Sequence, residues 1–101
     1  MPRISIDVPH RLDRDEMVER IRQRATAART TFGDHISEFR EQWTDHHAEF
    51  CMKVLGMKTT GTIAVEPETL RVSLELPLAA LLVRGAIEGR VRQELEALVR
   101  G

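Results

Sequence analysis

Several features that would narrow the function of this chain are scarce, beginning with cysteine. The single cysteine, Cys51, excludes an internal disulfide and fits a reducing compartment. An excess of one charge is also missing, because 15 Lys and Arg stand against 16 Asp and Glu, for a formal net charge of −1. Without a basic excess to neutralise phosphates, we expect no nucleic-acid partner.

Long apolar runs are missing as well. The longest covers only residues 76–83 and includes a proline, whereas a membrane-spanning helix needs about 20 apolar residues. The N-terminal segment Met-Pro-Arg-Ile-Ser-Ile-Asp lacks the apolar core of a secretion signal. We therefore expect a cytoplasmic protein with no membrane span.

Catalytic motifs are equally sparse. The chain has no Gly-x-Ser-x-Gly nucleophile motif, and Cys51 has no recognisable activating neighbours. His10 could pair with Asp7 or Asp13 as an acid–base group, but a packing or capping role at the junction between strand and helix is favoured. We expect no catalytic residue and no enzymatic activity.

Metal and phosphate sites are not indicated either. His46, His47 and Cys51 could each bind zinc, but adjacent histidines rarely converge on one ion, and no fourth ligand is nearby. Gly85 and Gly89 fall inside a predicted helix, so they cannot form a phosphate loop between a strand and a helix. The sequence predicts no metal and no cofactor.

What the chain does contain is alternation of apolar and polar residues in short segments. Residues 4–8 predict a strand that Pro9 ends, and residues 48–54 predict another. Residues 36–43 change parity partway, which indicates a β-bulge or a late strand start. Residues 44–47 resemble a turn and residues 56–60 a connection.

The clearest alternation is in residues 61–77, where two apolar runs flank a loop at residues 66–69. This loop pairs Val65 with Leu70 and Ile63 with Val72, which gathers the apolar residues on one face. A slip of one position would scatter them over both faces, so the pattern specifies its own register.

Two other segments show the spacing of about 3.6 residues that is typical of helices. The first covers residues 13–32, with Asp13 as N-cap and Gly33 as a stop. The second follows Pro77 and ends near Val99. Its apolar stripe consists of Ala80, Val83, Ile87, Val91, Leu95 and Leu98.

The predicted order of elements is therefore β-α-β-β-β-β-α. Alternating strands indicate a largely antiparallel sheet with one face in water. Both helices must then cover the other face. We predict a single two-layer α+β domain over residues 1–101.

The glycines of the last helix suggest a contact. A glycine in a helix costs about 1 kcal/mol relative to alanine, and a close approach of another backbone is the usual reason to keep one. The helix could cross its own sheet or the first helix there. Alternatively, an apolar strip contacts a partner. This helix strip consists of Leu78, Leu81, Leu82, Gly85 and Gly89.

A second candidate site lies between sheet and helices. Trp43, Phe50 and Met52 would rim a cradle there that could hold a hydroxyacyl chain or its thioester. A purely core role is the ordinary alternative for Trp43.

Short motifs along nearly the whole chain resemble the small polyhydroxyalkanoic acid system proteins, a bacterial family associated with polyester granule genes. The motifs are Ile4-x-Ile6-x-x-Pro9-His10-x-Leu12, Phe32-Gly33, Trp43 followed by Phe50, Gly61-Thr-Ile-x-Val65, Leu74-x-Leu76 and Leu81-Leu82…Ile87-Glu88. The chain departs from the family pattern by a longer segment between Gly33 and Trp43 and by His46-His47.

The resemblance implies an accessory role in polyhydroxyalkanoate metabolism and offers no catalytic residues to carry over. It favours a non-enzymatic protein that binds the granule surface, or a granule protein, through the helix strip. The alternative is a small-ligand-binding module that uses the cradle. The helix strip would also suit a homodimer with two-fold symmetry.

Overall fold

The computed structural model describes residues 3–31, 33, 36–54 and 56–100. The predicted order of strands and helices is confirmed. The elements are β1 (Arg3–Pro9), α1 (Arg14–Thr31), β2 (Ile36–Thr44), β3 (His47–Val54), β4 (Met57–Val65), β5 (Thr69–Glu75), the 3₁₀ helix η1 (Leu78–Val83) and α2 (Arg84–Arg100).

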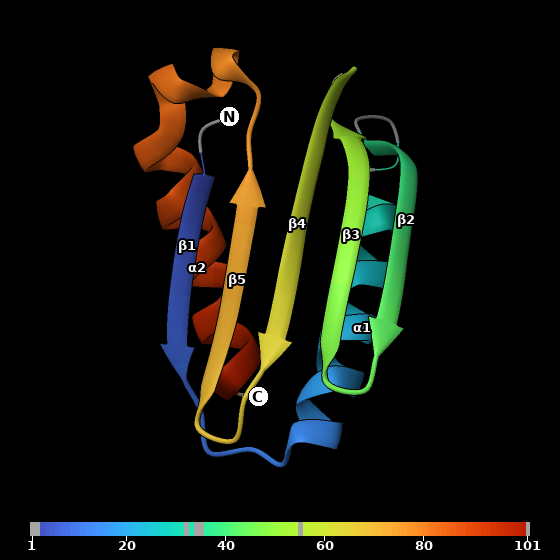
Figure 1. The fold of residues 1–101 in the computed structure, drawn as a ribbon, viewed down its shortest axis with the longest axis vertical. Helices are drawn as coiled ribbons and strands as arrows, with labels where there is room; N and C mark the ends of the chain where they lie inside the picture. Colours follow the sequence, from blue (N-terminus) through green and yellow to red (C-terminus); the bar gives the residue numbers. More distant parts are fainter. Residues whose placement is uncertain (1–2, 32, 34–35, 55, 101) are drawn as a thin grey trace.

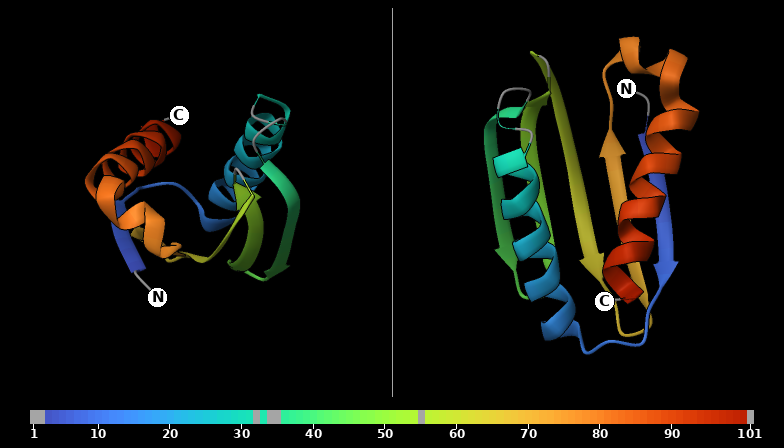
Figure 2. Two further views of the ribbon diagram at one scale, coloured as in Figure 1. Left: turned by 90° about the horizontal axis from the view of Figure 1, so that it is seen from above. Right: turned by 180° about the vertical axis from the view of Figure 1, so that it is seen from behind.

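The strands form one antiparallel sheet in the order β1-β5-β4-β3-β2. In Figure 1, α2 lies behind β1 and β5, and α1 lies behind β2 and β3. Seen from above in Figure 2, both helices lie on the same side of the sheet. The α+β architecture with two layers is therefore confirmed, and none of the described helices covers the second face of the sheet.

The β4–β5 hairpin has the register that its alternation predicts. Val65 pairs with Leu70 and Ile63 pairs with Val72, while the Glu66 N–H donates to the Thr69 carbonyl at 2.9 Å across the turn. β1 then adds its apolar residues to the same face of β5. The core consists of Ile4, Ile6, Val8, Met17, Ile21, Val65, Leu70, Val72, Leu74, Leu76 and Ala80.

Helix α1 begins where Asp13 caps it. The Asp13 carboxylate accepts a hydrogen bond from the Asp15 N–H at 3.0 Å, and the Asp13 carbonyl accepts the first helical bond, from the Met17 N–H at 2.9 Å. The helix ends at Thr31. Phe32, placed at its end from the sequence, lies outside the described residues.

The irregularity predicted in the second strand is a β-bulge. The pairing of β2 with β3 shifts register between Ser37 and Arg40, and Glu38 within the bulge has a φ of 52°. The turn that follows reverses the chain with only Asp45 and His46 between the paired residues Thr44 and His47, and Asp45 has a φ of 57°.

Residues 56–60 were predicted as a connection, and that prediction is wrong. β4 begins at Met57, and its polar residues 58–60 pair with residues 51–53 of β3. Gly56, at a φ of 79°, turns the chain so tightly that its polar neighbours enter the ladder. Backbone pairing with β3 therefore holds this stretch in the sheet, although it contains few apolar residues.

The last helix also departs from prediction, because it has two parts. η1 lies beyond the end of β5, and the chain then turns into α2, which runs back behind β1 and β5 (Figure 1). Ala80 is buried, but Val83, predicted on the core stripe, is 53% exposed. The change of direction at the η1–α2 junction removes Val83 from the face that α2 presents to the sheet.

Gly61 is needed where the sheet meets an aromatic side chain. A Cβ at this position would lie 2.5 Å from Cζ of Phe50 and 2.6 Å from the carbonyl oxygen of Ser73. Such distances require the Phe50 ring or the neighbouring strand to move. The absence of a side chain at Gly61 therefore leaves room for the Phe50 ring on the helix-covered face.

We expect Gly61→Ala to lower the free energy of unfolding by about 1–3 kcal/mol, because the added methyl overpacks the site. Gly85→Ala is the matched control, since a Cβ there meets no atom within 4 Å in the described part of the chain. That control should raise stability by up to about 1 kcal/mol through helix propensity. Urea denaturation measures both, and a Gly61→Ala variant as stable as the wild type would contradict this explanation.

Candidate functional site

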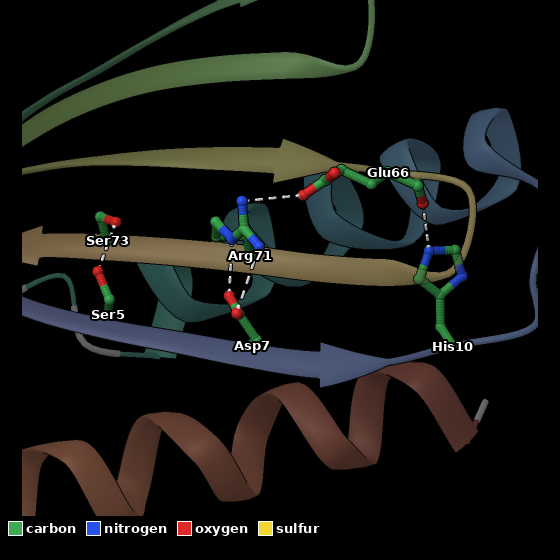
Figure 3. Close-up of polar contacts among 6 residues, drawn as sticks. All are labelled: Ser5, Asp7, His10, Glu66, Arg71 and Ser73. Atoms are coloured by element: carbon green, nitrogen blue, oxygen red, sulfur yellow. Dashed lines mark hydrogen bonds and ion pairs between the residues drawn. The ribbon is translucent and has the colours of Figure 1, made fainter.

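The face of the sheet without helices carries a ladder of paired polar side chains (Figure 3). Ser5 and Ser73 share a hydrogen bond of 3.0 Å across β1 and β5. Arg71 binds the Asp7 carboxylate through Nε at 2.9 Å and reaches the Glu66 carboxylate at 3.3 Å. The hydrogen bond to Asp7 raises the pKa of Arg71 further. These groups satisfy one another and offer no activated nucleophile.

His10, the one acid–base candidate of the sequence, is 6% exposed and bound to the backbone. Its Nε2 donates to the Glu66 carbonyl at 2.7 Å (Figure 3), and its Nδ1 accepts from the Leu12 N–H at 3.2 Å. The backbone N–H of His10 donates to the Glu68 carbonyl at 3.0 Å. Both ring nitrogens are therefore occupied, and His10 joins the start of α1 to the β4–β5 turn.

The three possible zinc ligands have different surroundings. His46 Nε2 lies 2.8 Å from Asp15 Oδ1 at the start of α1, so it links the β2–β3 turn to that helix. His47 is exposed, and Cys51 is a partly buried thiol on β3. Among the residues that the structure describes, no three His, Cys, Asp or Glu side chains gather where they could share a metal ion.

An apolar surface is exposed on η1, at one end of the sheet. We call it the η1 surface, and it consists of Leu78, Leu81, Leu82 and Val83. These four side chains are 72%, 46%, 95% and 53% exposed, respectively. A folded chain rarely leaves four apolar side chains within six residues in water, so this surface is a candidate contact.

Gly85 and Gly89 continue from the η1 surface along α2. The sequence left open whether the chain's own sheet or first helix approaches them. Within the described residues no atom lies within 4 Å of a Cβ built at either position, so that alternative is wrong. The two glycines instead leave a bare strip of helix backbone next to the exposed leucines.

A second apolar surface lines a groove between the two helices. We call it the interhelical groove, and its volume is about 990 Å³. Its walls come from one side of α1 and one side of α2, and its floor comes from β3, β4 and β5. The floor residues are Phe50, Met52, Ile63, Leu70, Val72 and Leu74.

Two of the three predicted rim residues lie in this groove, but as part of its floor. Phe50 and Met52 are partly buried there, whereas Trp43 packs against the core and is not among the lining residues. The Trp43 indole N–H is buried without a partner among the described groups.

Polar contacts join the two helices across the groove. Arg24 Nε donates to the Glu94 carboxylate at 3.1 Å, and Arg20 Nη1 donates to the Leu98 carbonyl at 3.1 Å. The hydrogen bond from Arg24 lowers the pKa of Glu94, and Arg90, 3.5 Å away on the same helix, adds to the effect. The groove therefore has an apolar floor and a charged rim.

Sequence reasoning missed this rim. Arg24 and Glu94 are 70 residues apart in the chain, and each resembles an ordinary solvated helix residue. Only the distance between the two helices, which no periodicity encodes, brings them together. The residues Arg90 and Glu94 did show the four-residue spacing of a helical ion pair, which is the one signal available.

These features define a two-layer α+β protein that leaves two apolar surfaces uncovered, with no helix among the described residues long and apolar enough to cross a membrane. A comparison with protein families gives the family. The chain belongs to the family described as "Putative polyhydroxyalkanoic acid system protein", whose model matches residues 4–99. Neither the curated proteins nor the solved structures that were searched gave a match.

We expect His10→Ala to lower the free energy of unfolding by about 1–3 kcal/mol, because it leaves the Glu66 carbonyl and the Leu12 N–H without their partner. His47→Ala, an exposed histidine, is the control and should stay within about 0.5 kcal/mol of the wild type. Chemical denaturation measures both. Equal stability of the two variants would show that His10 has no structural role.

The Arg24–Glu94 pair should make stability depend on pH. Because the pKa of Glu94 is lowered in the fold, the pair stabilises above the pKa of glutamate in the unfolded chain. That contribution is lost as pH falls through the lowered folded pKa. Both partners are well exposed, so the contribution stays below about 1 kcal/mol.

The measurement is the melting temperature of wild type and Glu94→Gln from neutral to acidic pH. The two curves should be furthest apart near neutral pH and meet in acid. A difference that stays constant with pH would contradict a role for the Glu94 charge.

Proposed function

We propose that this chain is a non-enzymatic accessory protein of the polyester granule system, which docks on the granule surface or on a granule protein through the η1 surface. The observation that carries the proposal is the exposure of Leu78, Leu81, Leu82 and Val83 together at one end of the sheet. Family membership supplies the system in which such a contact would serve.

The physical motive is the apolar area that docking would remove from water. Burial of such area contributes roughly 25 cal/mol per Å², before the costs of association. Leu82 at 95% exposure has nearly all of its side chain available. The 3₁₀ helix η1 follows the last strand, so its side chains can face solvent while all five strands stay in the sheet.

The glycines extend the proposed contact. Next to the leucines, Gly85 and Gly89 are open to solvent, so a partner's backbone could approach α2 closely there. A granule protein could use this approach, and so could a second copy of the chain in a two-fold dimer. Polyester granules form inside cells, so we place the protein in the cytoplasm.

The remaining faces support a role without chemistry. On the open face of the sheet, Arg71 is paired with Asp7 and Glu66, and His10 binds backbone groups through both ring nitrogens. We therefore infer binding as the function.

A second candidate function follows from a different observation, the interhelical groove. Its floor is apolar, and its volume of about 990 Å³ is at the upper end of small-molecule sites. The groove would hold a hydroxyacyl chain or its thioester between helices and sheet. Phe50 and Met52 would then contact the chain directly.

The test of granule docking is co-sedimentation with purified polyester granules. We expect the double variant Leu81→Glu and Leu82→Glu to bind at least tenfold more weakly, because two charges replace two side chains worth about 1.5–3 kcal/mol each when buried. Both leucines are exposed, so the fold should persist, with an unchanged circular dichroism spectrum.

The control carries the same change of charge elsewhere. Gln23→Glu with Thr26→Glu alters the exposed side of α1 and should bind like the wild type. Light scattering on the same samples reports whether the η1 surface forms a dimer instead. Undiminished granule binding by the folded leucine variant would refute docking through the η1 surface.

A further inference from the structure

The interhelical groove has a chemical asymmetry that narrows what it can hold. Its floor is made of apolar side chains, of which Phe50, Met52 and Ile63 are only partly buried. Its charged lining consists of Arg24 from α1 with Arg90 and Glu94 from α2. The groove therefore matches an amphiphile with a long apolar part and a small charged head.

The charges of the rim decide the sign of that head. Glu94 is shared by two guanidinium groups, because Arg24 Nε lies 3.1 Å from it and Arg90 Nη2 lies 3.5 Å from it. Two cations against one anion leave one positive charge in excess. A ligand with a single negative charge complements this rim, and a carboxylate fits the planar fork of arginine.

Arg90 is the arginine better able to bind an additional carboxylate. Its side chain is 68% exposed, and its contact with Glu94 is the longer of the two. Arg24, by contrast, makes two hydrogen bonds to the same Glu94 oxygen. An incoming carboxylate could therefore bind Arg90 while the Arg24–Glu94 contact still holds the helices together.

We propose that the interhelical groove binds an acyl chain ending in one free carboxylate, with the chain on Phe50, Met52 and Ile63 and the head on Arg90, assisted by Arg24. The inference rests on the second candidate function and goes further by naming the head group. It selects the free acid over a thioester with a polyanionic carrier, because the rim has only one positive charge in excess. Docking through the η1 surface does not depend on it.

The affinity should follow both parts of the ligand. Each two-carbon extension of the chain adds apolar area and should tighten binding by up to about tenfold, until the groove is filled. Removal of the carboxylate should weaken binding by about tenfold or more, since a hydrogen bond to a charged group contributes about 1.5–3 kcal/mol.

The experiment is calorimetric titration of the full chain with octanoate, decanoate and decan-1-ol below their aggregation limits. We expect decanoate to bind more tightly than octanoate, and decan-1-ol to bind at least tenfold more weakly than decanoate. Arg90→Gln, alone and together with Arg24→Gln, should remove the preference for the acid. The single variant keeps the Arg24–Glu94 link, so its result does not depend on the helices staying in place without that link.

Matched controls use the same two helices. Arg22→Gln with Arg92→Gln removes two charges outside the groove lining and should leave the preference intact. Ala25→Trp fills the groove and should abolish binding of both ligands, whereas Ala86→Trp, exposed and outside the lining, should not.

The possible outcomes distinguish the carboxylate assignment from the broader proposal that the groove binds a small ligand. Equal binding of decanoate and decan-1-ol, blocked by Ala25→Trp, would overturn the carboxylate assignment and leave the groove as an apolar ligand site. No binding of either ligand, or binding that Ala25→Trp leaves unchanged, would overturn both the assignment and the second candidate function.

Discussion

The structure depends on one constraint, which is that two helices must keep the apolar face of five strands out of water. They cover different parts of one face of the sheet, α2 behind β1 and β5, and α1 behind β2 and β3 (Figures 1 and 2). The buried core extends from β1 through β5 and β4 to α1 and η1, and partly buried side chains of α2 pack against it. Between the helices, however, the cover is incomplete, and the floor of the groove is formed by the central strands. Polar contacts, Arg24 with Glu94 and Arg20 with the Leu98 carbonyl, join the helices there.

The same constraint explains why the molecule's surfaces differ in character. The open face of the sheet can remain in water because its strands present polar side chains there, some of them paired across strands, as in Asp7 with Arg71 and Ser5 with Ser73. The η1 surface has no such compensation, since its leucines face solvent at the end of the sheet. Within the described part of the chain, the η1 surface and the groove therefore both expose apolar side chains. Under the proposals made above, a polyester surface or granule protein would cover the η1 surface, and an acyl ligand would occupy the groove.

The sequence predicted those parts of the fold that depend on local periodicity. The alternation in residues 61–77 defined the pairing of Val65 with Leu70 because any slip would expose apolar side chains. It also located the bulge in β2 and the leucines that form most of the η1 surface. It failed where the outcome depends on chain direction or on distance in space. The turn after η1 moved Val83 off the core stripe, and the spacing between helices created a groove whose rim joins residues far apart in the chain.

The central claim is that the η1 surface, rather than the open face of the sheet, meets the granule. Carbene footprinting of the protein with and without polyester granules tests it directly, because the label reports the exposure of individual side chains. The account predicts that labelling of Leu78 and Leu82 falls on granule binding, while that of Ser5 and Arg71 on the open face is unchanged. Unaltered labelling of the leucines, with protection of the open face instead, would contradict it.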